Sequence, residues 1–401
     1  MSGVIVIGAG QAGASCVARL RAKGYDKEIT LIGDEPVPPY QRPPLSKAYL
    51  LGDMTAERLY LRPEAFYADQ RIDLRMGQAV DAIDPTARTV TLGDDVLTYE
   101  DLVLATGSVP RRLPAAIGGA LDGVVTVRTL ADVDAMAPRF VSGARVLIVG
   151  GGYIGLEAAA VAAKLGLEVT LVEAAPRILQ RVAAQQTSDY VRGVHQAHGV
   201  DLREGVGLTR LTGEGHVSGA DLSDGSSLAV DFVIVGVGIQ PGQVLAEAAG
   251  LRIDNGIAVD AQGRTSDPHV WAAGDCASFP AHGGQARLES VGNAIDMAEL
   301  VADNILGAAR EYIPKPWFWS DQYDVKLQIA GLSAGFDRVV TRQSGDSVSF
   351  WYYAGDRLIA LDAMNDPRAY MVGKRLIEAG KSPAPDAVAD GATDLKALLK
   401  A

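Results

Sequence analysis

The residues whose spacing most clearly suggests chemistry are three glycines near the middle of the chain. They follow the apolar run 146–149 at G-x-G-x-x-G spacing and are Gly150, Gly152 and Gly155. Such spacing permits a tight strand-to-helix turn and lets a diphosphate reach the free N–H groups of the helix. The next predicted strand, 168–173, ends at Glu173, whose carboxylate suits a ribose diol. This stretch predicts a dinucleotide-binding unit.

The N-terminus repeats this pattern. The apolar run 4–7 precedes glycines at the same spacing, which are Gly8, Gly10 and Gly13. The following strand, predicted over 28–32, runs into a glycine before it reaches an acid. We therefore assign the first ribose contact to Asp34, with Glu35 as the alternative. Two such motifs in matched context argue against a chance match.

A proline-rich loop over 36–47 follows the first unit's second strand. Proline fixes backbone angles, so the loop is predicted to be rigid and to present Arg42 and Lys47 beside the first glycine turn as a cofactor clamp. The alternative is a stiff surface loop with solvated bases. Farther along, Asp275 ends a predicted strand and suits a polyol hydroxyl, the alternative being an ordinary helix N-cap.

The remaining pattern predicts an α/β protein with two tandem Rossmann-like domains of the glutathione reductase type and a C-terminal α+β domain. Each unit has a meander insert, expected to be antiparallel over 72–99 in the first. The predicted domains are a first nucleotide-binding domain over 1–110 and 239–313, a second over 111–238, and a C-terminal domain over 314–401.

Composition excludes several classes of protein. The net charge of −12 argues against nucleic acid or an anionic membrane as partner, and no apolar run is long enough to span a bilayer. A first strand near Val4 leaves no room for a signal peptide, and two cysteines form no disulfide framework, so a cytoplasmic location is expected. Cys16 and Cys276 are interpreted as packing residues. His195 and His198 have helical spacing but no third ligand, so we expect a solvated helix face and no metal.

Beyond these patterns, the chain resembles the glutathione-reductase-type flavoproteins and, within them, the NADH-dependent ferredoxin reductases of bacterial monooxygenase systems. The resemblance covers essentially the full length. The motifs that carry it are Pro43-Pro44-Leu45-Ser46-Lys47-Ala48-Tyr49-Leu50, the glycine stretch 150–157, Gly274-Asp275-Cys276-Ala277, Glu289-Ser290-Val291 and Trp317-Phe318-Trp319-Ser320-Asp321-Gln322-Tyr323.

The resemblance implies FAD on the first unit, NADH on the second and a C-terminal domain that covers the flavin. The FAD contacts that it implies are Gly8, Gly10, Ala12, Gly13, Asp34, Arg42, Lys47, Val80, Arg128, Asp275, Val291 and Trp319, with Arg42 variable among relatives. The NADH contacts that it implies are Gly150, Gly152, Ile154, Gly155, Glu157 and Glu173. Lys47, Glu157 and Trp319 take the catalytic roles, with Lys47 and Glu157 as an ion pair beside the flavin.

The implied reaction moves hydride from NADH to FAD and then single electrons to a 2Fe–2S ferredoxin that feeds a cytochrome P450 monooxygenase. A monomer is expected. Docking on a ferredoxin needs a local basic patch, with candidates Arg58, Arg62, Arg368, Lys374, Arg375 and Lys381. Three alternatives stay open: NADPH use assisted by Arg177 and Arg181, a Rieske-type oxygenase ferredoxin or a rubredoxin as acceptor, and an NADH-sensing binding protein of the apoptosis-inducing-factor type.

Overall fold

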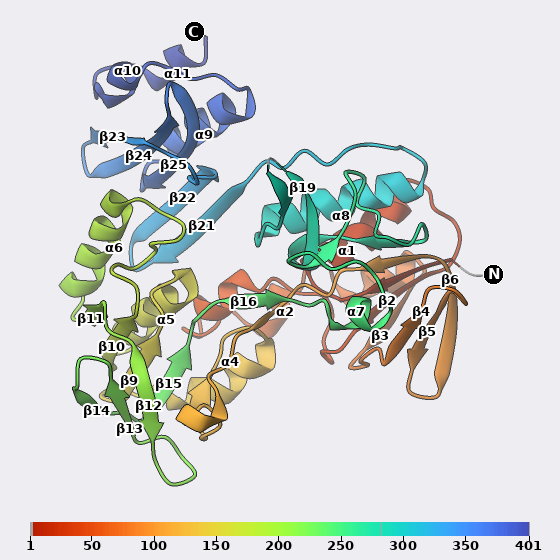
Figure 1. The fold of residues 1–401 in the computed structure, drawn as a ribbon, viewed down its shortest axis with the longest axis horizontal. Coiled ribbons are helices and arrows are strands. Elements are labelled where there is room, and N and C mark those ends of the chain that lie inside the picture. The colour runs from red at the N-terminus through yellow and green to blue at the C-terminus, as the bar shows by residue number, and fades with distance from the viewer. Residues whose placement is uncertain (1–2, 282, 401) are drawn as a thin grey trace. The chain divides into compact units, whose positions relative to one another are not determined.

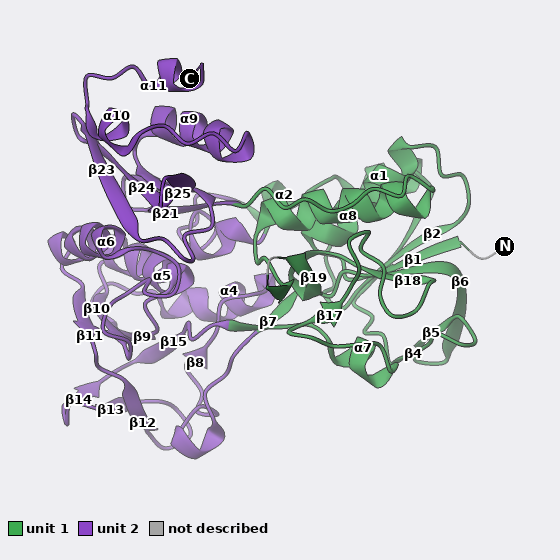
Figure 2. Ribbon diagram, turned by 45° about the horizontal axis from the view of Figure 1, so that its top comes forward, with its two compact units in different colours: residues 1–41, 55–109, 239–316 green, residues 42–54, 110–238, 317–401 purple. Residues whose placement is uncertain are grey.

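The structure is a computed structural model that describes residues 3–281 and 283–400. It contains two compact units, each assembled from separate stretches of sequence (Figure 2). The first unit comprises 1–41, 55–109 and 239–316, and the second comprises 42–54, 110–238 and 317–401. The three-domain division predicted above stays a proposal; the second unit holds the 111–238 domain and the 314–401 domain except for its first three residues.

The first unit is built around a sheet in the order β3-β2-β1-β6, extended past β6 by β5 and β4 (Figure 1). Strand β18 also pairs with β6 (Figure 2). Strand β6 changes partners along its length, because its first half pairs antiparallel with β5 and its second half pairs parallel with β1 and β18. These strands are β1 (Gly3–Ile7), β2 (Ile29–Gly33), β3 (Ile72–Met76), β4 (Ala82–Asp84), β5 (Thr89–Leu92), β6 (Asp95–Leu104) and β18 (Val270–Ala272).

One expectation for this unit was wrong. Strand β3 lies in the stretch predicted as an antiparallel meander, yet it pairs in parallel with β2, Leu31 opposite Leu74. Only β4, β5 and β6 form the meander. Alternation of apolar and polar residues identifies a strand, but the direction of pairing depends on a partner some 40 residues away, which local pattern does not encode.

Helices α1 (Gln11–Ala22) and α8 (Val291–Ile305) pack against one another over this sheet. Helix α1 buries Cys16, Val17 and Leu20 at helical spacing and ends just before Gly24, as predicted. Across the helix pair, the guanidinium of Arg19 binds both carboxylate oxygens of Asp303, at 2.7 and 2.8 Å. The unit's other elements are α2 (Ala56–Leu59), α3 (Glu64–Asp69), α7 (Val244–Ala248), β16 (Ile239–Pro241), β17 (Ile257–Ala258), η4 (Gly274–Cys276), β19 (Ala277–Ala281) and β20 (Gly284–Ala286).

The second unit contains a fully parallel sheet in the order β11-β10-β9-β15-β8, as expected for strands joined by helical crossovers. A three-stranded antiparallel sheet, β12-β13-β14, forms its meander. The bounds are β8 (Val124–Val125), α4 (Leu130–Met136), β9 (Arg145–Val149), α5 (Tyr153–Lys164), β10 (Glu168–Glu173), α6 (Gln185–Ala197), β11 (Asp201–Glu204), β12 (Leu208–Thr212), β13 (Gly219–Leu222), β14 (Ser227–Ala229) and β15 (Phe232–Val235). Short 3-10 turns occur at η1 (Pro43–Ser46), η2 (Ala115–Ile117) and η3 (Ala137–Arg139), and β7 (Ser108–Pro110) lies where the chain passes from one unit to the other.

The same unit includes a five-stranded antiparallel sheet in the order β21-β22-β25-β24-β23, with helix α9 packed on it. Four of its strands match predicted ones, whereas β21 falls where only a domain start was expected. The bounds are β21 (Trp317–Gln322), β22 (Val325–Gly331), β23 (Arg338–Ser344), β24 (Ser347–Ala354), β25 (Arg357–Met364), α9 (Pro367–Glu378), α10 (Pro385–Ala389) and α11 (Leu395–Leu398). Among the helices that the structure describes, none is long and apolar enough to cross a bilayer.

Candidate functional site

The first glycine turn joins β1 to α1 and leaves no room for side chains at two of its positions. A Cβ on Gly13 would lie 2.0 Å from the carbonyl oxygen of Gly8, which itself has a φ of +110°. Gly10, by contrast, faces open space, with nothing within 4 Å of its missing Cβ. No side chain in the described residues caps this end of α1, and its first turn holds no acid. The turn therefore offers both the room and the free N–H donors that a diphosphate requires.

The second glycine turn joins β9 to α5 and has the same construction. A Cβ on Gly155 would lie 2.2 Å from the carbonyl oxygen of Gly150, whereas Gly152 again faces open space. Helix α5 likewise begins with no acid in its first turn. Ile154, the second residue of this helix, is 39% exposed beside the turn. Both turns thus fit the diphosphate of a dinucleotide.

The acid that follows each turn is held differently in the two units. Glu173 ends β10, and its carboxylate oxygens accept the N–H groups of Gly151 and Ala175, each at 2.7 Å. In the first unit Asp34 is exposed, whereas Glu35 is half-buried and accepts the hydroxyl of Tyr40 at 2.6 Å. Glu173 is therefore anchored beside its glycine turn.

Arg177, considered above as a partner for a 2′-phosphate, is used within its own loop. Its guanidinium donates to the hydroxyl of Ser188 at 2.6 Å and to the carbonyl of Ala183 at 2.8 Å. Arg181 is exposed. Of the two arginines proposed to assist NADPH, Arg177 is thus occupied in closing the loop before α6.

The predicted ion pair between Lys47 and Glu157 is present. The Lys47 ammonium lies 2.7 Å from Glu157 Oε2, and the two side chains are 16% and 4% exposed. Two serine hydroxyls complete the shell: Ser46 donates to Oε2 at 2.6 Å and Ser320 donates to Oε1 at 2.7 Å. A carboxylate removed from water needs such donors, since burying an ion costs several kcal/mol. The alternative of a solvated Lys47 is wrong.

Three separate stretches of the second unit supply these groups. Helix α5 carries Glu157 on its buried face, and η1, with prolines at its first positions, ends in Ser46 just before Lys47. Strand β21 alternates, so that Ser320 is fully buried while Trp319 points to the opposite face. The sequence interpretation missed Ser46 and Ser320 as functional groups. The sequence of 317–322, three aromatic residues followed by three polar ones, has no apolar–polar alternation that predicts the inward direction of Ser320.

The other predicted flavin contacts fall into two sets. In the second unit, Arg42 donates to the carbonyl of Arg128 at 2.8 Å, and the Trp319 and Trp317 rings stack with centroids 5.5 Å apart. In the first unit, Asp275 lies in the turn η4 and accepts the hydroxyl of Ser108 at 2.9 Å. Ala12 is buried in α1, Val80 packs on the core, and Val291 begins α8.

The structure excludes one alternative and overturns one expectation. Asp275 is not a helix N-cap, because Ser290 caps α8 by accepting the N–H of Asn293. His195 does not lie on a solvated face: it is fully buried, and burial lowers its pKa to about 4. His198 is exposed and stacks on Tyr323.

Some of the predicted basic residues come together on the C-terminal part of the second unit. Helices α9 and α11 border a groove of about 620 Å³ lined by four cations and three apolar side chains, which are Arg368, Met371, Val372, Arg375, Lys396, Leu399 and Lys400. Arg368 of this set pairs with Asp394. Outside the set, Lys374 pairs with Glu378, and Lys381 donates to the carbonyl of Leu399 at 2.9 Å. Arg58 and Arg62 are exposed in the first unit. We call the first set the basic groove.

Comparison with known families gives two adjacent matches. Residues 2–298 match the pyridine nucleotide-disulphide oxidoreductase family, and residues 317–399 match a family described as reductase C-terminal. These matches confirm the predicted fold class of a two-domain nucleotide-binding region followed by a C-terminal domain.

Individual relatives align over nearly the whole chain. A ferredoxin–NAD(P)+ reductase of a Sphingomonas species is 46% identical, covering 94% of this chain and 92% of its own. The crystal structure of a covalent complex of putidaredoxin reductase with putidaredoxin matches with a TM-score of 0.96 at 39% identity, over 100% of this chain and 98% of that one. The ferredoxin reductase of the CYP199A2 system from Rhodopseudomonas palustris matches with a TM-score of 0.95 at 42% identity, over 99% of both chains.

Proposed function

This chain belongs to the pyridine nucleotide-disulphide oxidoreductase family, and from that premise we propose that it is an NADH-dependent ferredoxin reductase. It takes hydride from NADH onto FAD and passes electrons singly to a 2Fe–2S ferredoxin that serves a cytochrome P450 monooxygenase. The full-length similarity to reductases of that kind supports this choice of acceptor. The single observation that carries the proposal is the buried Lys47–Glu157 pair, in a chain without a reactive thiol.

The chain's own residues position the cofactors and balance their charge. When bound, FAD supplies the hydride and single-electron chemistry. The glycines Gly8, Gly10 and Gly13 would hold its diphosphate, and Asp34 remains the proposed ribose contact. Lys47 places a fixed cation in a poorly hydrated site, where it stabilises developing negative charge more strongly than water would. The other proposed contacts are Ala12, Arg42, Val80, Arg128, Asp275, Val291 and Trp319 for FAD.

A covalent thiol mechanism is disfavoured by the cysteines themselves. The sequence has two, and both are free and fully buried. Burial raises the pKa of Cys16 to about 12 and raises that of Cys276. Since the thiolate is the reactive form, neither residue suits disulfide chemistry at neutral pH. This separates the chain from the disulfide reductases of its own family.

We infer that NADH is preferred over NADPH. The anchored carboxylate of Glu173 keeps lone pairs for a ribose 2′-hydroxyl but repels a 2′-phosphate, and Arg177 is occupied within its loop. The remaining proposed NADH contacts are Gly150, Gly152, Ile154, Gly155 and Glu157. Glu173→Ala should lower the ratio of kcat/KM for NADH to kcat/KM for NADPH by about tenfold or more. Both rates are measured from the loss of absorbance of the reduced nicotinamide. Equal use of both coenzymes by the unmodified protein contradicts this inference.

The basic groove is our proposed docking surface for the ferredoxin. Its four cations, of which Arg368 is paired with Asp394, contrast with the overall charge of −12, so an acidic carrier would be drawn to this face rather than to the rest of the molecule. The rate of ferredoxin reduction should fall as the salt concentration rises from about 50 to about 300 mM, whereas the rate of FAD reduction by NADH should change much less. Arg375→Glu should weaken the ferredoxin step in the same selective way.

The decisive experiment is steady-state NADH oxidation by the purified flavoprotein, with and without a 2Fe–2S ferredoxin coupled to cytochrome c. Strong stimulation by ferredoxin supports the proposal. Bound FAD with slow, ferredoxin-independent oxidation contradicts it and favours an NADH-sensing binding protein. Replacing the ferredoxin with a Rieske-system ferredoxin or a rubredoxin identifies the class of carrier.

A further inference from the structure

The polar contacts of Glu157 continue through four more side chains of the second unit. Ser320 donates to Glu157 Oε1 at 2.7 Å, and the amide nitrogen of Gln322 lies 3.1 Å from the Ser320 hydroxyl. The amide oxygen of Gln322 lies 2.8 Å from His195 Nε2, and His195 Nδ1 lies 3.1 Å from the hydroxyl of Tyr323. We call Ser320, Gln322 and His195 the carboxylate chain.

Every hydrogen bond along the carboxylate chain is donated in the direction of Glu157. A carboxylate only accepts, so the Ser320 hydrogen is committed to Glu157 and the Ser320 oxygen must accept from Gln322. The amide oxygen of Gln322 then accepts from His195, which requires the Nε2–H tautomer. Tyr323 consequently donates to Nδ1 of the neutral ring. If the Gln322 amide were flipped, its oxygen would face Ser320 and would compete with Glu157 for the only hydrogen of the Ser320 hydroxyl.

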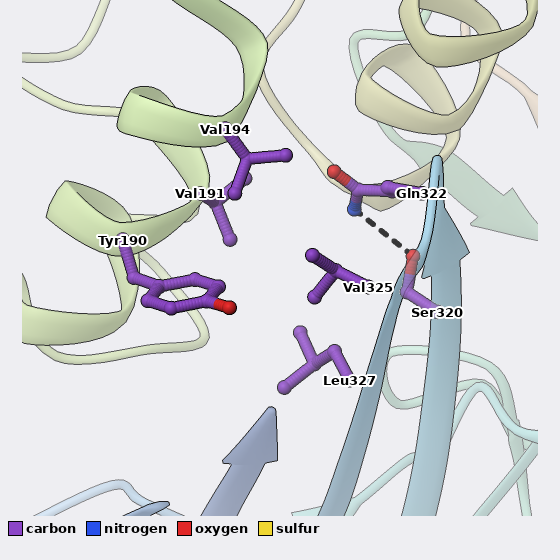
Figure 3. A pocket seen from close by; sticks show the side chains of 7 residues that line it. All are labelled: Tyr190, Val191, Val194, Ser320, Gln322, Val325 and Leu327. Carbon is purple, nitrogen blue, oxygen red and sulfur yellow. Dashed lines mark hydrogen bonds between the residues drawn. The ribbon is translucent and has the colours of Figure 1, made fainter. Parts of the chain in front are cut away.

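The surroundings of the carboxylate chain leave little room for water to replace a missing member. Ser320 and His195 are 0% exposed and Gln322 is 4% exposed. The space beside Ser320 and Gln322 amounts to only about 10 Å³ and is bordered by Tyr190, Val191 and Val194 of α6 (Figure 3). That volume is at the lower limit for a single water molecule. Loss of one hydrogen bond would therefore leave its partner unsatisfied rather than hydrated.

Strand β21 connects the carboxylate chain to the proposed flavin site. Phe318, Ser320 and Gln322 share one face of the strand, and Phe318 packs on Tyr153 of α5 with ring centroids 4.8 Å apart. The opposite face carries Trp319. One strand thus fixes both the proposed flavin-facing tryptophan and the hydroxyl that binds Glu157 Oε1.

We propose that Ser320, Gln322 and His195 are positioning residues, which hold Glu157 Oε1 so that Oε2 faces Lys47 in the orientation needed for hydride transfer from NADH. The proposal rests on the proposed function for its hydride-transfer step. Because the carboxylate chain acts on the orientation of Glu157, its loss should lower the rate of flavin reduction at saturating NADH more than it weakens NADH binding.

The experiment measures flavin reduction by NADH in single turnover, which involves no ferredoxin. Ser320→Ala and Gln322→Met should each lower the limiting rate on the order of tenfold, with the Kd for NADH changed less than threefold. Gln322→Glu is the directional variant: it can accept from His195 but cannot donate to Ser320, so it should be slowed as much as Gln322→Met. Val191→Ala, which borders the same space outside the chain, is the matched control and should retain the full rate.

A second readout is independent of activity. Nitrogen-15 NMR of the histidines in the purified flavoprotein should show His195 as the Nε2–H tautomer, and Gln322→Met should shift it toward a mixture of tautomers. The proposal is overturned if His195 is the Nδ1–H tautomer, or if Val191→Ala slows flavin reduction as much as Ser320→Ala does. Absence of ferredoxin turnover with both readouts as expected would instead count against the proposed function alone.

Discussion

Two of the carboxylates buried in the second unit, Glu157 and Asp362, differ in a way that separates a chemical role from an architectural one. Glu157 and Asp362 are 3% and 1% exposed, and each accepts hydrogen bonds from two hydroxyl groups. Glu157 also has the ammonium of Lys47 at 2.7 Å. The contacts of Asp362 within the described residues include Thr187, at 2.6 Å, and Tyr352, but no cation.

The difference appears in the protonation of Asp362. Burial raises its pKa from 3.8 to about 6, and the hydrogen bonds from Thr187 and Tyr352 only partly oppose that effect. Hydroxyl donors alone therefore do not compensate the lost hydration of a carboxylate. Asp362 joins β25 and β24 to helix α6, which is an architectural role, whereas the pairing of Glu157 with a cation is what a site of charge transfer requires.

The largest expected effect comes from removing the cation. Lys47→Met should slow flavin reduction by NADH between about 100-fold and 1,000-fold, because a fixed charge at a desolvated site contributes that much to catalysis. Stopped-flow absorbance at the flavin band measures the rate. Asp362→Asn should keep the rate within twofold. Similar losses in both variants would abolish the distinction between the two carboxylates.

The same substitution should also destabilise the fold. Lys47→Met leaves Glu157 buried without its cation, which typically costs about 3–5 kcal/mol and lowers the midpoint of thermal unfolding. Lys47→Met combined with Glu157→Gln removes both charges, so it should recover most of the stability while flavin reduction stays slow. If the double variant is as unstable as the single one, the pair is not the cause.

Asp362 should give a smaller, pH-dependent effect. Because its folded pKa of about 6 exceeds the usual 3.8, the folded state binds more protons between these values, and stability falls as pH rises through that window. The loss is at most about 3 kcal/mol. Asp362→Asn removes this contribution, so the stability of the unmodified protein relative to the variant should fall as pH rises from 4 to 7, as followed by thermal unfolding. Tyr153 and Tyr352, which also interact with Asp362, do not titrate in this range.

The contribution of His195 to stability should depend on pH in the opposite direction. The net change of stability with pH in the unmodified protein is therefore the smallest expected effect. Its folded pKa of about 4 lies below the usual 6.5, so the unfolded state binds more protons between them and stability rises with pH there. The two groups nearly cancel between pH 4 and 6. The stability of His195→Gln should therefore fall as pH rises between 4 and 6, whereas the stability of Asp362→Asn should rise. His198 and Tyr323, the neighbours of His195, are retained in both variants.

Much of the fold and part of the site could be predicted from the sequence, because the signals are local. Each glycine turn occupies six residues, and its geometry requires glycine at Gly8 and Gly13 whatever lies elsewhere. Lys47 and Glu157 were paired only through family resemblance. Nothing in their own neighbourhoods indicates that residues 110 positions apart are in contact.

The remainder depends on pairing between distant segments. Strand β3 was given the wrong direction because its partner β2 lies far back in the chain. His195 was expected in solvent because a helix face reveals nothing about the sheet that will cover it. Serine carries no functional signal alone, so Ser46 and Ser320 became significant only when three segments converged on one carboxylate.

The interleaved sequence of the two units has a consequence for biosynthesis. The sheet and helix layer of the first unit are incomplete until β18 and α8 have been translated, since β18 pairs with β6 and α8 packs on α1 (Figure 2). The parallel sheet of the second unit, by contrast, has all its strands once β15 is made. On the ribosome, the sheet started second can therefore be finished first. The nascent N-terminal strands must wait for about 200 further residues, and they are the segment for which a chaperone would matter most.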